Sequence, residues 1–140
     1  MSDPEVSTEI GWEVVHRRYV SYAHAHYAGN LVDGAWGLGL FGDVATEMCI
    51  RTDGDEGLFA SYSDVQFLAP VRAGDVVEAR ATLRRVGRRS REIEFTLVVV
   101  ARGVTPLESP GEPTSGSASA ARLLTEPILA TRAVGTVVVP

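Results

Sequence analysis

Residues 31–50, LVDGAWGLGLFGDVATEMCI, decide the fold of this chain. Apolar side chains recur there at three- and four-residue spacing, which predicts one long helix with an apolar face: Val32, Ala35, Leu38, Phe41, Ala45 and Met48. Each glycine in a helix interior costs about 1 kcal/mol relative to alanine, and this stretch holds Gly34, Gly37, Gly39 and Gly42. We therefore expect a deeply buried helix, with sheet strands or a ligand close to its backbone.

Strand-like segments lie on both sides of this helix. Residues 12–23 predict a first strand, and a turn at residues 53–57 separates the helix from four more strands at residues 58–71, 76–86, 90–102 and 128–139. Apolar and polar residues alternate in the stretch 92–99, as in a sheet with one buried face. We expect the last three strands to be antiparallel neighbours. This order predicts an α+β fold in which an antiparallel sheet wraps around one central helix.

Length and composition indicate a single domain over residues 1–140. The 45% hydrophobic content is enough for one core. Residues 1–10 are expected to form a polar tail, and residues 105–121, rich in Pro, Ser and Gly, a mobile surface loop. The sequence shows no apolar stretch of membrane-spanning length and no secretory signal, so we expect a cytoplasmic protein that does not enter a membrane.

Several kinds of chemistry are excluded by residue usage. Cys49 is the only cysteine, so no disulfide can form within the chain, and we expect its side chain to be buried as a small apolar group. All 13 basic residues are arginine, which excludes lysine Schiff-base chemistry. The net charge of -5 argues against nucleic acid as a partner.

Two motifs, HAHYAGNLVDG at residues 24–34 and FGDVATE at residues 41–47, carry a specific resemblance. With further matches at residues 53–59, 67–71, 73–75, 86–87 and 132–136, the chain resembles the 3-aminobutyryl-CoA and β-alanyl-CoA ammonia lyases. The resemblance implies a single hotdog domain, in a homodimer or higher homo-oligomer with active sites at the subunit interface. It also implies a carbon–nitrogen lyase that eliminates or adds ammonia or an amine at the β-carbon of a 3-aminoacyl thioester.

Other activities stay open. The related acyl-CoA thioesterases share the Gly-Asn turn before the helix and the later Pro-Val-x-x-Gly-Asp turn, so hydrolysis of an acyl thioester is the alternative reaction. Hydration of an enoyl thioester and non-catalytic thioester binding are further possibilities. His24 stands where the lyase pattern has an acidic residue, which leaves the amine, the acyl chain and the thioester carrier undetermined.

The candidate catalytic residues are Asp43, Glu47 and His26. Asp43 and Glu47 are four residues apart and share one helix face, so one is expected to act as the base and both to hold the substrate ammonium. Desolvation and mutual repulsion would raise the pKa of one of them. The alternative is an exposed helix flank paired with arginines. His26 is expected to shuttle a proton or orient a carboxylate, or else to have a structural role, as we expect for His16.

Substrate contacts are expected where the helix begins. Backbone N–H groups there suit the thioester oxygen, and the nearby residues are Gly29, Asn30, Gly34, Tyr27 and His24, each with a structural role as the alternative. His24 and His26 lack a third metal ligand, so we expect no metal, and no cofactor beyond the coenzyme A or carrier-protein phosphopantetheine of the substrate.

A run of arginines marks the hairpin between two of the predicted strands. Arg88 and Arg89 are expected to meet the phosphates of coenzyme A or an acidic acyl carrier protein. The alternative is a solvated hairpin whose charges protect a sheet edge.

Overall fold

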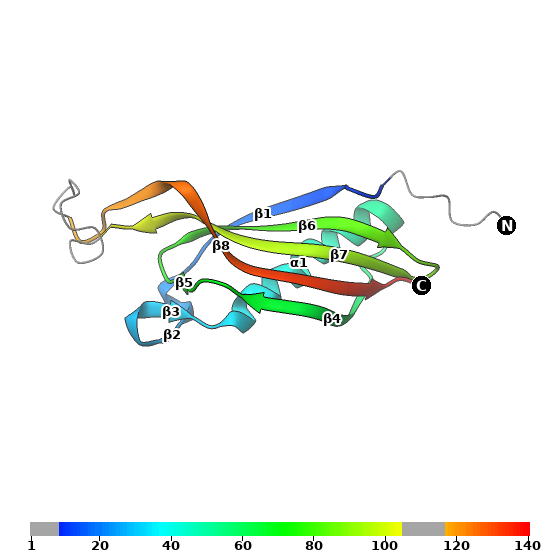
Figure 1. Ribbon diagram of the computed structural model, residues 1–140, viewed down its shortest axis with the longest axis horizontal. Coiled ribbons are helices and arrows are strands. Elements are labelled where there is room, and N and C mark those ends of the chain that lie inside the picture. The colour runs from blue at the N-terminus through cyan, green and yellow to red at the C-terminus, as the bar shows by residue number, and fades with distance from the viewer. Residues whose placement is uncertain (1–8, 105–116) are drawn as a thin grey trace.

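The computed structural model describes residues 9–104 and 117–140. In chain order the elements are β1 (Glu13–Tyr19), β2 (Ala25–Tyr27), β3 (Leu31–Val32), α1 (Gly34–Asp53), β4 (Leu58–Phe67), β5 (Val71–Arg72), β6 (Val76–Val86), β7 (Ser90–Gly103) and β8 (Ala121–Val138). Two short 3₁₀ turns, η1 (Tyr22–His24) and η2 (Ala28–Asn30), flank β2. Figure 1 shows the long strands running alongside the helix α1.

Five strands form an antiparallel sheet in the order β1-β6-β7-β8-β4, and α1 packs on one face of it. A second, smaller sheet of β2, β3 and β5 lies beside the start of α1. Because β6, β7 and β8 are neighbours, the predicted adjacency of the last three strands is confirmed. The predicted sheet around a central helix is also confirmed.

The ends of α1 are fixed by a cap at each terminus. The Asp33 carboxylate accepts a hydrogen bond from the Trp36 backbone N–H at 3.2 Å, as an N-cap residue does. Gly54 ends the helix in the left-handed conformation, at φ 65°, and its N–H donates to the Ile50 carbonyl. The helix therefore starts later than predicted, because Leu31 and Val32 pair with β5 as strand β3.

The core lies between α1 and the inner face of the sheet. Phe41 of α1 stacks on Phe95 of β7 with ring centroids 5.0 Å apart, and both side chains are fully buried. Cys49 is buried as expected, and burial raises the pKa of its thiol to about 11, so the group stays protonated at neutral pH.

Two of the four helix glycines have a close neighbour that leaves no room for a side chain, which explains why glycine stands there despite its cost in helix stability. A side chain at Gly34 would overlap the ring of Phe67, and a Cβ at Gly37 would lie 2.9 Å from Leu97 Cδ2. At Gly39 and Gly42 a Cβ would meet no described atom within 4 Å. The expectation of close burial along the whole glycine series was therefore wrong for this second pair, which faces away from the sheet.

Most strand boundaries follow the prediction. The strand at residues 76–86 is found as predicted, whereas the one predicted at 58–71 is interrupted after Phe67, where Leu68 and Ala69 both donate backbone hydrogen bonds to the Ala130 carbonyl. β8 starts earlier than predicted because Ala121–Leu123 still pairs with the end of β7. Most of the predicted mobile loop and of the polar tail lies outside the described residues.

Two ion pairs hold the ends of these elements in place. Arg91 of β7 donates to both Asp53 carboxylate oxygens, at 3.0 and 2.6 Å, at the end of α1. Asp75, only 1% exposed, accepts from the Arg102 guanidinium and from the Arg72 backbone N–H, which fixes the turn between β5 and β6. No helix among the described residues is long and apolar enough to cross a membrane.

Candidate active site

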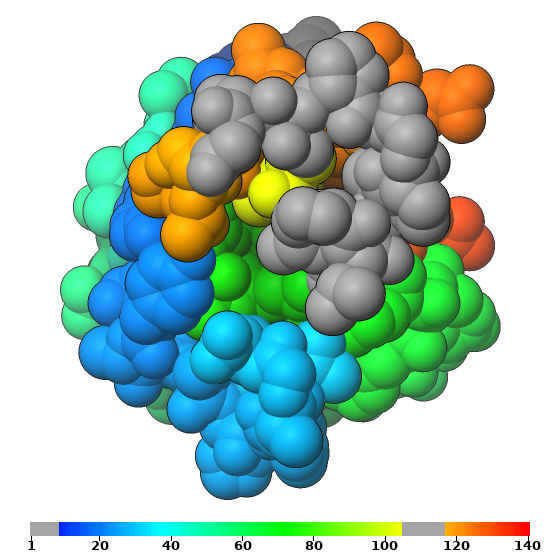
Figure 2. All heavy atoms as spheres, turned by 90° about the vertical axis from the view of Figure 1, so that its left-hand side faces the viewer, coloured from blue at the N-terminus to red at the C-terminus, as the bar shows by residue number. Residues whose placement is uncertain are grey.

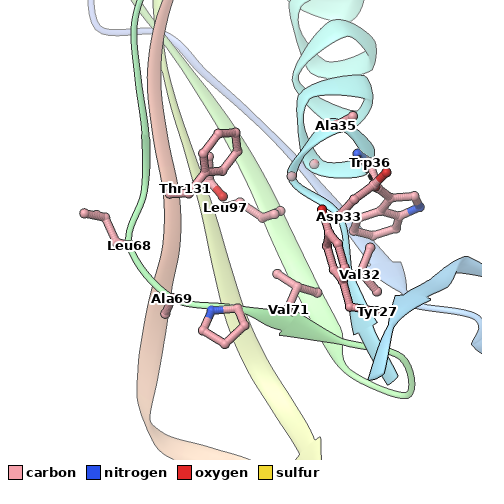
Figure 3. A pocket seen from close by; sticks show the side chains of 14 residues that line it. Tyr27, Val32, Asp33, Ala35, Trp36, Leu68, Ala69, Val71, Leu97 and Thr131 are labelled. Carbon is pink, nitrogen blue, oxygen red and sulfur yellow. Dashed lines mark hydrogen bonds between the residues drawn. The ribbon is translucent and has the colours of Figure 1, made fainter. Parts of the chain in front are cut away.

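A cavity of about 600 Å³ opens where α1 begins. Figure 3 shows Tyr27, Val32, Asp33 and Trp36 on one side of it, with Leu97 and Thr131 from the sheet on the other. The segments that line it come from β2, the start of α1, the turn after β4, and strands β7 and β8. This convergence follows from the fold, since the small sheet closes one side of the cavity and the strand β8 closes the other.

Asp33 supplies a carboxylate to this cavity, and no other acidic residue is among the described residues that line it. One of its oxygens, Oδ1, accepts from the Trp36 N–H, and Oδ2 takes part in none of the described hydrogen bonds. The backbone N–H groups of the first helical turn lie beside it and have no partner within the helix, so they form a positive dipole end. The Asp33 carboxylate, a hydrogen-bond acceptor, and backbone N–H groups, which are donors, therefore lie together at the start of α1.

Two hydroxyl groups complete the polar lining. Thr131 of β8 is only 4% exposed and lines the cavity, and its hydroxyl takes part in none of the described side-chain hydrogen bonds. Tyr27, at the end of β2, lines the cavity from the opposite side.

The remaining walls are apolar. Val32, Val71 and Leu97 line the cavity together with the ring of Phe67, which lies against the Gly34 backbone. Apolar walls lower the local dielectric and so strengthen each electrostatic contact inside. The cavity suits an apolar chain that carries one polar, reactive group.

Comparison with known proteins assigns the chain to a family. The model of the thioesterase superfamily matches residues 30–103. The chain is 48% identical over 118 residues to the 3-aminobutyryl-CoA ammonia lyase of Acetoanaerobium sticklandii. The matched region covers 83% of this chain and 85% of the relative. The chain belongs to the ammonia lyases of the thioesterase superfamily.

Solved structures agree with this assignment. The β-alanyl-CoA:ammonia lyase of Clostridium propionicum superposes with a TM-score of 0.82 at 35% identity, covering 93% of this chain and 86% of the other. A hexameric hotdog fold thioesterase of Campylobacter jejuni superposes with a TM-score of 0.68 at 20% identity, covering 88% and 79% of the two chains, and shows the shared fold alone. The predicted hotdog fold and the resemblance to the ammonia lyases are confirmed.

The ammonia lyase motif at residues 24–34 lies around the cavity. Tyr27 and Gly34 line it, and His24 packs against Trp36 with ring centroids 5.7 Å apart. His26 contacts the Tyr27 ring edge-on at 4.6 Å. Gly29 and Asn30 line a second, separate cavity.

Asp43 and Glu47 lie elsewhere on α1. Asp43 is exposed and follows Gly34 by nine residues, which places it about 14 Å further along the helix axis. Neither residue lines the cavity. Within one protomer, Asp43 and Glu47 therefore do not reach the cavity.

The carboxylate of Glu47 is fully engaged. Oε1 bonds His16 Nε2 at 2.9 Å, and Oε2 accepts from Arg51 Nε at 2.9 Å. The hydrogen bond from His16 is the main cause that holds the pKa of Glu47 below its usual value, with help from Arg51. The rise in pKa that we expected for one of the two acids does not occur at Glu47, because the partners of its carboxylate favour the charged form.

Arg88 and Arg89 lie on the hairpin between β6 and β7, near the end of α1, whereas the cavity lies at its start. Neighbouring arginines on this hairpin pair with sheet glutamates, Arg84 with Glu94 and Arg85 with Glu92. Contact of Arg88 or Arg89 with a coenzyme therefore stays a prediction, and within one protomer they are remote from the cavity.

The residues that sequence reasoning missed are Asp33 and Thr131. Asp33 was part of the ammonia lyase motif, but an aspartate directly before a helix is ordinarily read as a cap. Thr131 carries no motif, and it reaches the cavity only because the strand register sets it opposite Leu97 and Phe67. Among the described residues no three His, Cys, Asp or Glu side chains gather as a metal site, and the absence of a metal stays a prediction.

Proposed function

We propose that this chain eliminates ammonia from a 3-aminoacyl thioester, or adds it to the enoyl thioester in reverse. One observation carries the proposal: the Asp33 carboxylate, the acidic group among the described lining residues, lies in a mainly apolar cavity at the positive end of a helix. The named activities of the two ammonia lyases to which the chain is similar support the same reaction.

Elimination needs a base for the proton next to the thioester carbonyl, and donors for the carbonyl oxygen as it gains negative charge. Asp33 takes that proton, the electron pair forms the carbon–carbon double bond, and the carbon–nitrogen bond breaks to release neutral ammonia from the substrate ammonium. The N–H groups of the first turn of α1 hold the thioester oxygen. In this proposal the hydroxyl groups of Thr131 and Tyr27, which line the same cavity, orient the amine.

Hydrolysis of an acyl thioester is the second candidate. The family model that matches residues 30–103 is that of the thioesterases, and a carboxylate beside a helix start also suits activation of water. The two reactions differ in product, because hydrolysis releases a free thiol and amine addition does not.

The test incubates purified protein with a short enoyl-CoA, with and without ammonium, and follows both the free thiol and the 3-aminoacyl product. We expect the amine adduct without thiol. Thiol without adduct would identify the chain as a thioesterase, and neither product would contradict both reactions.

Paired substitutions test the assignment of the base. Asp33→Asn retains a good N-cap residue, so we expect a folded protein whose kcat falls about 100-fold or more. Asp43→Asn, an equally conservative change on the exposed side of α1, is the comparison. A large loss of kcat with Asp43→Asn and none with Asp33→Asn would overturn the role of Asp33.

We also propose a homo-oligomer. The outer edge of β4 pairs with no described strand, and Leu58 and Phe67 on it are 72% and 59% exposed. Such an edge invites pairing with a second copy. Any catalytic role for Asp43, Glu47, Arg88 or Arg89 would have to act on the cavity of a neighbouring subunit. A carrier-protein partner and a cytoplasmic location stay predictions.

A further inference from the structure

The cavity at the start of α1 has an open end and a closed end. Tyr27 and Leu68 line it and are 58% and 51% exposed, whereas Leu97 and Thr131 line it from the sheet and are only 1% and 4% exposed. Figure 2 looks onto the end of the molecule where the small sheet, in light blue, lies beside green segments that include β5. The arm of a thioester has to leave through the open end, so the alkyl end of the acyl group points inward.

Leu97 closes the inner end of the cavity against α1. A Cβ at Gly37 would lie 2.9 Å from Leu97 Cδ2, which is closer than such contacts normally come. The Leu97 side chain therefore already fills the space beside Gly37, and Figure 3 shows it directed from the sheet toward the helix. Because protein interiors are close-packed, a chain that reaches Leu97 can go no further unless that side chain moves.

The distance from the proposed base to this closed end is short. Gly37 follows Asp33 by four residues, which is about 6 Å along the helix axis. An extended chain advances about 1.2 Å per bond, because a backbone residue of three bonds spans about 3.3–3.6 Å. With the α-carbon at Asp33, the β-carbon and one to three further carbons therefore fit before the chain meets Leu97.

The strand register sets Thr131 directly beside Leu97. Thr131 of β8 pairs with Leu97 of β7 on one side and with Phe67 of β4 on the other. The Cβ atoms of residues paired in this way lie about 5 Å apart. An amine oriented by Thr131 would therefore leave the next carbons of the acyl chain against Leu97, where they would be buried from water.

We propose that Leu97 sets the length of the acyl chain, and that the substrate is a 3-aminoacyl thioester of four to six carbons. The inference rests on the proposed function, since it adds to that reaction the acyl group on which it acts. A three-carbon acyl group leaves Leu97 uncovered, and an eight-carbon group has to displace it.

Three variants test this role of Leu97. Leu97→Val removes the Cδ2 atom that meets Gly37 and keeps a residue that suits a strand. Leu83→Val is the matched control, because Leu83 of β6 is also 1% exposed in the core and is not among the described residues that line the cavity. Gly37→Ala works in the opposite direction, since it adds a methyl group at the closed end while favouring the helix.

The first measurement is calorimetric binding of acyl-pantetheine analogues in which a methylene group replaces the sulfur. These ligands can undergo neither hydrolysis nor loss of ammonia, and their arm is common to coenzyme A and carrier-protein thioesters. For the parent and Leu83→Val we expect the four-carbon ligand to bind at least about threefold more tightly than the three-carbon ligand, because one more carbon is buried. We expect it to bind at least about tenfold more tightly than the eight-carbon ligand.

The two cavity variants should shift this preference in opposite directions. Leu97→Val should reduce the preference for four over eight carbons to about threefold or less. Gly37→Ala should weaken binding of the six-carbon ligand at least about fivefold relative to the three-carbon ligand. Equal affinities for all lengths in the parent, no binding of the four-carbon ligand, an unchanged preference in either folded variant, or the same shift in Leu83→Val would overturn the proposal. None of these outcomes depends on whether the protein is a lyase.

The second measurement uses the matching enoyl thioesters with ammonium as substrates. For Leu97→Val we expect KM of the eight-carbon substrate to fall at least about fivefold and kcat to change less than about twofold, because Leu97 meets the chain end and not the reacting atoms. An equal fall in kcat at every chain length would contradict the proposal. A protein that shows the binding pattern but forms no amine adduct would overturn the proposed reaction and leave the role of Leu97 standing.

Discussion

Gly34 joins the helix start to the cavity, because its missing side chain leaves room for the ring of Phe67. Substitution by alanine would force this ring to move, and Phe67 lines the cavity. We expect Gly34→Ala to change the free energy of unfolding by no more than about 1 kcal/mol, since alanine favours the helix and the exposed ring can give way.

The functional effect of Gly34→Ala should be larger. We expect kcat/KM for the acyl thioester to fall about tenfold, measured by initial rates. Gly39→Ala is the control, because a Cβ there meets open space on the side of α1 away from the sheet. A similar fall in both variants would show that the effect comes from the helix and not from the cavity.

At this scale the sequence predicted part of the cavity lining and missed Asp33, the base that we propose. Gly34 and Tyr27 were named and do line the cavity. Asp33 was missed because one carboxylate oxygen does serve as a cap, and sequence cannot show that the other faces a cavity. The contact of Glu47 with His16 was not foreseen, because His16 comes from β1, 31 residues away, and no local spacing reveals it.

Among the elements, the end of α1 depends on one ion pair with the sheet. The exposed side-chain fractions of Arg91 and Asp53 are 11% and 19%. We expect Arg91→Met to lower the free energy of unfolding by about 3 kcal/mol at pH 7, because it leaves a largely buried carboxylate without its cation. Arg85→Met, which removes an exposed pair with Glu92, should cost no more than about 1 kcal/mol.

The contribution of this ion pair should depend on pH in one direction. Burial alone would raise the pKa of Asp53, but hydrogen bonds from Arg91 and Thr52 outweigh it and lower the pKa. A lowered pKa stabilises the folded state above the unfolded value, near 4, and that stability is lost as the pH falls through the folded value. Urea unfolding should be measured at pH 7 and pH 3, at one protein concentration. We expect the difference in free energy of unfolding between the parent and Arg91→Met to be smaller at pH 3. A larger difference at pH 3 than at pH 7 would contradict this account.

The elements themselves were largely predictable, because alternation and turn residues are local signals. The strand at residues 76–86 was found where expected, and Gly54 ends the helix within the predicted turn. The small sheet was not foreseen, since β3 and β5 are two residues each and are defined only by their pairing. Residues that pair across such distances leave no periodic pattern in the sequence.

For the whole molecule, the unpaired edge of β4 predicts association. Light scattering should give a mass that is a multiple of the 15.0 kDa protomer. We expect Leu58→Asp on β4 to weaken association, and Leu123→Asp, at 74% exposure on the extension of β8, to leave it intact. A parent protein that stays at 15.0 kDa at micromolar concentration would contradict the proposed oligomer.

The order of strands in the main sheet also governs how the chain acquires its structure. β4 pairs only with β8 in this sheet, and Leu58 meets Val138, almost at the end of the chain. β1 likewise cannot pair until β6 has been synthesised, because its partner strand is β6, with Glu13 opposite Thr82. During synthesis α1 is complete long before either edge strand can close over its apolar face. The apolar face of α1 therefore stays only partly covered until β8 has left the ribosome, a period in which chaperone contact would protect the nascent chain from aggregation.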